Sequence, residues 1–256
     1  MNRLQRAFSN GKAFIPFITA GYPSLEITQQ LVWEMAKAGA DLIELGIPFS
    51  DPVAEGPVIQ EANYCALSAG TTTDKIFDMV ENIRKSCDVP LAFMTYANPV
   101  FTYGAERFMK KSREVGIDAV IIPDVPFEEK DEFLPFCSKY GIEFISMIAP
   151  SSHERVRMIA DEARGFVYCV SSMGVTGVRK EIGNEAMDMI KLVKEVRDIP
   201  CAIGFGISTP EQAARMSRFS DGVIVGSAIV RIIGQYGEDC VSHVVDYVRE
   251  MKSAIK

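Results

Sequence analysis

The sequence is poor in histidine and tryptophan, with 2 His and 1 Trp among 256 residues. His153 and His243 lie in stretches that read as polar helix surface, and neither has a partner at the spacing of metal ligands. The six cysteines form no CxxC pair and most lie within apolar runs, which is typical of buried reduced thiols. We therefore expect no metal site and no disulfide framework.

An excess of positive charge and a long apolar run are also missing. The formal net charge is −7, and Lys and Arg are scattered among Asp and Glu, so we do not expect a nucleic-acid partner. No apolar run reaches the roughly 20 residues that a membrane-spanning helix needs. Residues 1–12 lack the apolar core of a secretion signal. These observations predict a cytoplasmic protein without a membrane partner.

The chain does contain a regular series of short apolar segments. Hydrophobic residues make up 48% of the sequence and charged residues 24%, the balance of a folded globular protein. Each apolar segment is followed by a polar turn and a stretch with helical spacing. Eight strands are predicted, at 13–19, 41–45, 90–95, 118–123, 143–148, 165–170, 201–205 and 221–226.

The segments between the strands predict helices that end at glycine. Residues 24–39, SLEITQQLVWEMAKAG, place apolar residues at intervals of three and four and stop at Gly39. Strands rich in Val, Ile and Phe need cover on both faces, as in a parallel sheet wrapped by helices. We predict a single-domain α/β fold for residues 1–256: a (β/α)8 TIM barrel with an extra N-terminal helix and a mobile loop after strand 6. An open doubly wound sheet is the alternative, but no GxGxxG follows the first strand.

The active site of such a barrel lies at the C-terminal ends of its strands. Glu44 interrupts an apolar strand there, and alternation puts it on the face of Leu42, with Ile43 and Leu45 on the other face. If that face is the interior, burial favours the neutral carboxyl and suits it to proton exchange. The alternative is a strand-end glutamate that pairs with a nearby base and has only a structural role.

Two loops carry further candidates. Asp51 and Glu55 follow Glu44 in the loop ELGIPFSDPVAEGP (44–57) and are candidates for a second carboxylate, although an exposed acidic loop explains them equally. Tyr168 is expected at the barrel mouth. The Gly- and Ser-rich loop after it reads as a lid, in which amides near Gly177 reach an anion, or as an ordinary flexible loop.

A phosphate site is expected at the ends of the seventh and eighth strands. GFGIS (204–208) and VGSAIV (225–230) supply glycines that permit close backbone approach. A short helix that starts at Ser227 points its N-terminal amides at the anion. Both halves occur at the strands where barrels of this kind bind phosphate, so a small phosphorylated substrate is predicted.

Taken together, these motifs resemble the tryptophan synthase alpha subunit family from PFITAGYPS (16–24) through GSAIVRII (226–233), nearly the whole chain. The resemblance implies a lyase that cleaves indole-3-glycerol phosphate to indole and glyceraldehyde 3-phosphate. It also implies that indole passes to a beta subunit, which carries pyridoxal phosphate, in an α2β2 heterotetramer. No cofactor is expected on this chain.

The resemblance also assigns residues. Glu44 matches the catalytic glutamate that protonates indole C3 and accepts the proton of the glycerol hydroxyl, and Glu55 matches a second acid that bonds the indole N–H. The other implied residues are Tyr168 in the active site; Thr176 in the lid; Phe17, Met94, Tyr96, Ile148 and Phe205 around the indole ring; Gly177, Gly206, Gly226 and Ser227 at the phosphate; and Asp51, Pro52 and Asn98 at the beta subunit.

Two positions depart from the family pattern. Glu55 stands where the family usually has Asp, and Ser172 stands where many relatives have Arg. The change at Glu55 lowers activity or is absorbed by a shifted loop, and the change at Ser172 alters how the lid is anchored. Three alternatives to the alpha subunit stay open. These are a free-standing indole-releasing lyase, a regulatory partner with feeble activity, and a related phosphate-binding barrel isomerase, against which the 44–52 loop argues.

Overall fold

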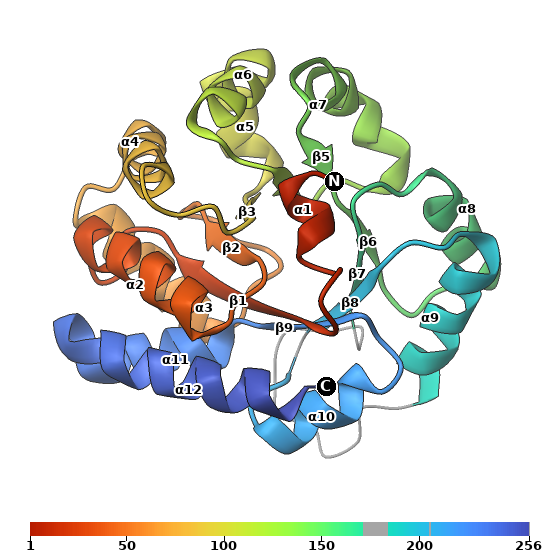
Figure 1. The fold of residues 1–256 in the computed structure, drawn as a ribbon. Coiled ribbons are helices and arrows are strands. Elements are labelled where there is room, and N and C mark those ends of the chain that lie inside the picture. Colours follow the sequence, from red (N-terminus) through yellow and green to blue (C-terminus); the bar gives the residue numbers. More distant parts are fainter. Residues whose placement is uncertain (171–183, 205, 256) are drawn as a thin grey trace.

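The computed structural model describes residues 1–170, 184–204 and 206–255 and shows a parallel sheet surrounded by helices (Figure 1). The strands in these ranges are β1 (Ala13–Thr19), β2 (Ile43–Gly46), β3 (Leu91–Met94), β4 (Ala119–Ile121), β5 (Glu143–Phe144), β6 (Ser146–Ile148), β7 (Val167–Val170), β8 (Cys201–Gly204) and β9 (Gly222–Val225). Every predicted strand is present, and the one expected at 143–148 is split in two.

Helices connect and cover the strands. In the described part of the chain they are α1 (Arg3–Arg6), α2 (Leu25–Ala38), α3 (Pro57–Ser68), α4 (Thr73–Arg84), α5 (Ala97–Tyr103), α6 (Ala105–Val115), α7 (Leu134–Tyr140), α8 (His153–Glu162), α9 (Asn184–Val196), α10 (Pro210–Ser217), α11 (Ser227–Tyr236) and α12 (Cys240–Ala254), with short 3-10 turns η1 (Phe127–Glu132) and η2 (Gly237–Asp239). The predicted helix end at Gly39 is confirmed, because Gly39 has the left-handed φ of 108° that closes α2.

The sheet closes into a barrel. Its strand order is β5-β4-β3-β2-β1-β9-β8-β7-β6, and all of its strand pairs are parallel. The two end strands are consecutive pieces of one segment, joined through Ile145, whose N–H donates to Val120 O at 2.9 Å. The ring is therefore continuous, which confirms the predicted barrel and excludes the open doubly wound sheet.

The core has two layers, one on each face of the strands. The outer layer lies between the strands and the helices and includes Ile43 and Leu45. The inner layer fills the barrel and includes Leu42 and Tyr168. Alternation along β2 therefore places side chains as expected, with Leu42 inside and its neighbour Ile43 outside.

The N-terminal segment covers the middle of the barrel in the view of Figure 1. Leu4 and Ala7 are buried in the inner layer. The Phe8 ring lies 5.4 Å from that of Phe166, between centroids. The predicted extra N-terminal helix is thus confirmed as α1, and it closes the face opposite to the strand ends that carry the site. The loop expected after strand 6 lies outside the described residues.

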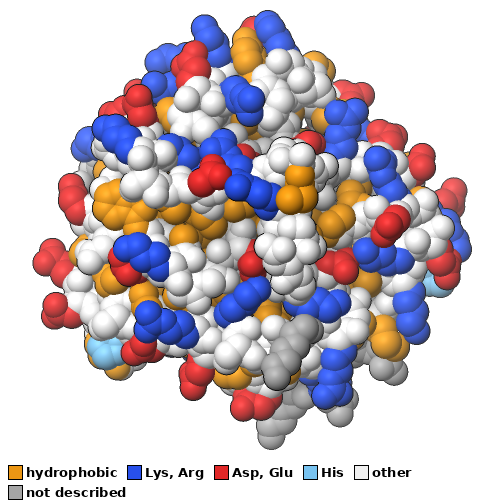
Figure 2. Space-filling view, in the orientation of Figure 1, with side chains coloured by type: hydrophobic (Ala, Val, Ile, Leu, Met, Phe, Trp, Pro, Cys, Tyr) orange, Lys and Arg blue, Asp and Glu red, His pale blue; other side chains and the backbone are white. Residues whose placement is uncertain are grey.

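Charged side chains of both signs are interspersed on the face that Figure 2 shows, with no broad patch of one sign. This agrees with the scattered Lys and Arg of the sequence. Among the helices described, none combines the length and the apolarity needed to cross a membrane.

Candidate active site

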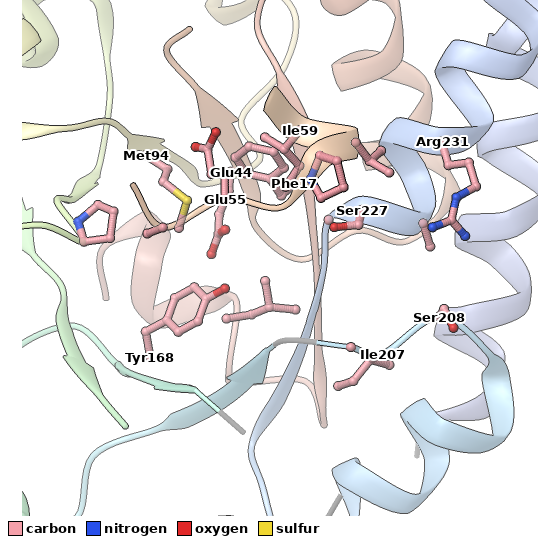
Figure 3. A pocket seen from close by; sticks show the side chains of 18 of the residues that line it. Phe17, Glu44, Glu55, Ile59, Met94, Tyr168, Ile207, Ser208, Ser227 and Arg231 are labelled. Carbon is pink, nitrogen blue, oxygen red and sulfur yellow. The ribbon is translucent and has the colours of Figure 1, made fainter. Parts of the chain in front are cut away.

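A cavity opens at the C-terminal ends of the strands (Figure 3). Strand residues and the loops that follow them line it: Phe17, Glu44, Ala54, Glu55, Pro57, Val58, Ile59, Met94, Tyr96, Pro123, Met147, Tyr168, Gly206, Ile207, Ser208, Ile224, Gly226, Ser227, Ala228 and Arg231. Both predicted acids of the catalytic pair and most of the predicted substrate contacts therefore share one cavity. In Figure 3 the two acids lie on the side of Met94, whereas Ser208 and Arg231 lie on the other side.

Glu44 lies inside the barrel, on β2 between Phe17 of β1 and Ala92 of β3. Its residue is 0% exposed, and neither carboxyl oxygen has a hydrogen-bond partner among the described residues. Burial raises the pKa of Glu44 from 4.5 to about 8, because the charged form loses its solvation. With no described base to pair with, the purely structural alternative is not supported, and the carboxyl is protonated at neutral pH.

Glu55 lies in a more polar environment than Glu44. Asn63 Nδ2, on α3, donates to Glu55 Oε2 at 2.6 Å. Burial raises the pKa of Glu55 to about 7, while hydrogen bonds from Asn63 and Tyr96 oppose the increase. The Tyr96 hydroxyl also accepts from Ala54 N at 3.1 Å and so holds the loop that carries Glu55. The second acid is therefore ionised more readily than Glu44.

Tyr168 lines the cavity from β7 and is 5% exposed. Burial, with a further contribution from the charge of Glu44, raises the pKa of its phenol. The hydroxyl therefore keeps its proton and serves as a hydrogen-bond donor. Its tip fits closely against the backbone of β8, since a Cβ built on Gly204 would lie 2.7 Å from the Tyr168 hydroxyl.

The predicted indole contacts divide into three groups. Phe17, Met94 and Tyr96 line the cavity as expected. Ile148 does not: it is buried in the outer layer of the core, and Met147 lines the cavity in its place. The prediction was wrong because Ile145 faces the interior, so alternation turns Met147 inward and Ile148 toward the helices. Phe205 and the lid residues Thr176 and Gly177 lie outside the described residues.

The opposite end of the cavity has the geometry of an anion site. Gly206 has φ +77°, a conformation that a residue with a side chain rarely adopts, and Gly226 and Ser227 begin α11 with no side-chain cap on its first amides. A Cβ on Gly226 would lie 3.2 Å from Phe17 Cδ1, so glycine keeps this corner open. These amides, which no described side chain caps, and the positive end of the helix dipole favour a phosphate group.

The residues expected at a partner surface lie outside this cavity. Asp51 and Asn98 are exposed and Pro52 is half-buried. The Asp51 carboxylate accepts a hydrogen bond from the neighbouring Ser50 hydroxyl, and Asn98 Oδ1 accepts from Thr102 Oγ1 at 3.1 Å. Val53 and Tyr64, both 73% exposed, add apolar surface. The surface is accessible, and its role at a partner stays a prediction.

Comparison with known proteins agrees with the geometry of the site. The family model described as Tryptophan synthase alpha chain matches residues 4–256. The chain belongs to the tryptophan synthase alpha chain family. Its reaction is the lyase reaction of that family, the cleavage of indole-3-glycerol phosphate to indole and glyceraldehyde 3-phosphate.

Individual members of the tryptophan synthase alpha chain family are similar throughout. The alpha chains of Lacticaseibacillus casei and Thermoanaerobacter sp. (strain X514) are each 45% identical, over 100% of this chain and 96% and 100% of theirs. The subunit alpha structure from Legionella pneumophila str. Paris gives a TM-score of 0.90 at 37% identity, with 100% and 98% of the two chains covered. A structure of the tryptophan synthase a2b2 complex from Pyrococcus furiosus gives 0.87 at 35% identity, with 95% and 99% covered.

Sequence reasoning missed several residues that line the cavity or support it. Asn63 holds Glu55 but lies eight positions later, on the helix that follows the acidic loop. Arg231 lies one helical turn after Ser227, a spacing that predicts the same helix face and was readable from the sequence. Ile59 and Ile207 come from loop and helix positions with no distinctive pattern.

The other ionisable residues do not form a metal site in the described ranges. No group of three or more His, Cys, Asp or Glu side chains there has the geometry to hold a metal ion. His153 and His243 are exposed on helices, as predicted. All six cysteines are free and four are buried, whereas Cys87 is half-buried and Cys65 is exposed.

Proposed function

We propose that Glu44 is the proton donor and acceptor of indole-3-glycerol phosphate cleavage in this chain, and that the Glu55 carboxylate binds the indole N–H and stabilises the protonated ring. The observation that carries the proposal is the contrast between the two carboxyls in one cavity. Glu44 is fully buried without a described partner, and Glu55 is partly buried and hydrogen-bonded to Asn63. Burial favours the protonated form of Glu44, and the hydrogen bond from Asn63 favours the ionised form of Glu55, so the two carboxyls suit different roles.

The proposed step conserves atoms and charge. Glu44 gives its proton to C3 of the indole ring, and the Glu55 carboxylate accepts a hydrogen bond from the indole N–H and stabilises the positive charge. Glu44, now ionised, takes the proton of the glycerol hydroxyl next to C3. The bond between C3 and that carbon breaks, the electron pair returns to the ring, and indole and an aldehyde result. Glu44 ends the cycle protonated.

The cavity supports one orientation of this substrate. Phe17, Ile59 and Met94 supply apolar walls for the indole ring. Gly206, Gly226 and Ser227 supply backbone groups for the phosphate at the other end. Tyr168, whose hydroxyl keeps its proton, is placed to donate to the substrate.

We propose that the chain assembles with a beta subunit as α2β2 and passes indole to it. The support is the similarity to the Pyrococcus furiosus chain solved as an a2b2 complex. Asp51, Pro52 and Asn98 are the proposed contacts. We further propose that residues 1–256 act as one domain without a cofactor, with pyridoxal phosphate on the beta subunit, in the cytoplasm, where the six free thiols stay reduced.

The test is indole release from indole-3-glycerol phosphate by the purified chain, alone and with a beta subunit. We expect cleavage on the order of one turnover per second in the complex and slower cleavage alone. Equal rates in the two settings would support a free-standing lyase. No cleavage in either would leave only a regulatory partner or a different phosphate-binding barrel, and would overturn the proposal.

Glu55→Asp is expected to lower kcat about 10-fold, although the family usually has Asp at this position. The shorter side chain withdraws the carboxylate by one methylene from Asn63 Nδ2, which now lies at 2.6 Å. Steady-state rates of indole release for Glu55→Asp and wild type measure the change. A kcat equal to that of wild type would show that the loop moves to absorb the difference.

A further inference from the structure

Arg231 is the cationic side chain that faces the proposed phosphate site. It lines the cavity together with Gly206, Ser208, Gly226 and Ser227. Figure 3 shows Arg231 and Ser208 at the end of the cavity away from the two catalytic acids. Among the described residues that line the cavity, Arg231 is the single Lys or Arg.

The helix geometry directs Arg231 toward the anion. Arg231 follows Ser227 by four residues on α11, so both lie on one face of the helix. Helical side chains lean toward the N-terminus, which here is the end whose first amides no described side chain caps. This lean favours a position of the exposed Arg231 side chain near the first turn, which Gly226 and Ser227 begin.

A bound phosphate dianion needs more positive charge than the first turn of α11 supplies. The chain has a formal net charge of −7, and Glu55, the more readily ionised of the two acids, lies in the same cavity. A phosphate monoester carries nearly two negative charges at neutral pH, whereas a helix N-terminus offers the equivalent of about half a positive charge. Arg231 makes no ion pair or hydrogen bond with a described residue, so its charge is not already used within that part of the chain.

The wall opposite Arg231 is fixed. Ser208 N donates to Gln212 Oε1 at 2.8 Å, and the Tyr247 hydroxyl donates to Ser208 O at 3.0 Å. These bonds tie the turn after β8 to helices α10 and α12. A phosphate between this turn and α11 therefore meets a rigid wall on one side and a long cationic side chain on the other.

We propose that Arg231 is a specificity-determining residue that binds the phosphate dianion of the substrate and favours phosphorylated over unphosphorylated ligands. The inference rests on the proposed function, because it takes Gly206, Gly226 and Ser227 as the phosphate site. The Arg231 guanidinium supplies a charge-assisted hydrogen bond that the backbone amides alone do not provide. Arg231 takes no part in proton transfer, so its loss weakens substrate binding and leaves the chemical step unchanged.

The test compares Arg231→Gln with Arg231→Lys and with the control Arg249→Gln. Arg249 is exposed on α12, pairs with Asp246 at 3.4 Å, and does not line the cavity, so its variant makes the same change in net charge. We expect Arg231→Gln to raise KM for indole-3-glycerol phosphate about 10-fold with kcat within about 2-fold of wild type. Arg231→Lys should recover part of the loss, and Arg249→Gln should behave as wild type.

Binding of two probes separates the phosphate from the rest of the cavity. The dissociation constant of inorganic phosphate should rise about 10-fold in Arg231→Gln, and that of indole should not change. A dissociation constant of phosphate for Arg231→Gln equal to that for Arg249→Gln would overturn the inference. Equal weakening of phosphate and indole binding would also overturn it, because Arg231 would then affect the shape of the cavity and not the binding of the negative charge.

The experiment distinguishes an error in the role of Arg231 from an error in the proposed function. If wild type releases indole and Arg231→Gln keeps the wild-type KM, only the role of Arg231 is wrong. If wild type releases no indole, the proposed function fails, and phosphate binding to the wild type and the variants still decides whether Arg231 holds the anion.

Discussion

Glu44→Gln is expected to lower kcat for indole release by about 10³-fold while KM stays within a few-fold of wild type. Glutamine fills the same volume but neither gives nor takes a proton at the required pKa. Glu44 is 0% exposed and reaches no described partner, so the amide replaces a neutral acid with little change in packing. Steady-state kinetics with indole-3-glycerol phosphate, in the presence of a beta subunit, measure both constants.

Glu250→Gln is the matched control for this experiment. Glu250 is an exposed carboxylate on α12 that does not line the cavity. Its variant should keep the wild-type kcat. Unchanged phosphate binding in Glu44→Gln would show that the cavity is intact. A Glu44→Gln enzyme that retains more than about a tenth of the wild-type kcat would contradict the assigned role.

The same substitution is expected to stabilise the fold at alkaline pH. The pKa of Glu44 is about 8 when folded and 4.5 in the unfolded reference, so between these values the folded state holds a proton that the unfolded state has released. The free energy of unfolding of wild type therefore falls as pH rises from 4.5 to about 8. Glutamine has no such proton to lose, so at alkaline pH the variant has a higher free energy of unfolding than wild type.

Urea denaturation at several pH values measures the difference. At pH above 8 we expect Glu44→Gln to exceed wild type by about 2 to 5 kcal/mol, with the gain disappearing toward pH 4.5. Glu250→Gln should follow wild type across the range. A Glu44→Gln protein less stable than wild type at alkaline pH would show that the buried carboxylate is stabilised by contacts other than those of the described residues. Loss of activity with gain of stability separates a catalytic role from a structural one.

The barrel itself was readable from the sequence because its signals are local. Short apolar strands and glycine helix ends depend on neighbouring residues, and alternation placed Glu44 and Leu42 on one face of their strand. The prediction for Ile148 was wrong because the orientation of that strand is not set locally. Strand 143–148 breaks into β5 and β6 at Ile145, and the register of its inward residues follows from contacts with β4 and β7 that no local pattern reveals.

The electrostatic properties of the site were harder to predict from the sequence. The sequence left open whether Glu44 is buried or pairs with a base, and the lack of a described hydrogen-bond donor is a property of the packed barrel. The bond from Asn63 to Glu55 likewise joins a helix to a loop whose path depends on Tyr96. Arg231 was readable from its spacing to Ser227, because the two residues lie four positions apart in one predicted helix.

The protonation state of Glu44 before substrate binds is the most direct test of its role as the acid. Infrared difference spectra of wild type against Glu44→Gln, from about pH 5 to about pH 9, isolate the C=O stretch of this one protonated carboxyl. We predict a protonated-carboxyl band at neutral pH that disappears with a midpoint near 8. A difference spectrum with no protonated carboxyl above about pH 6 would show that Glu44 is ionised before it meets the substrate, and would contradict its role as the acid.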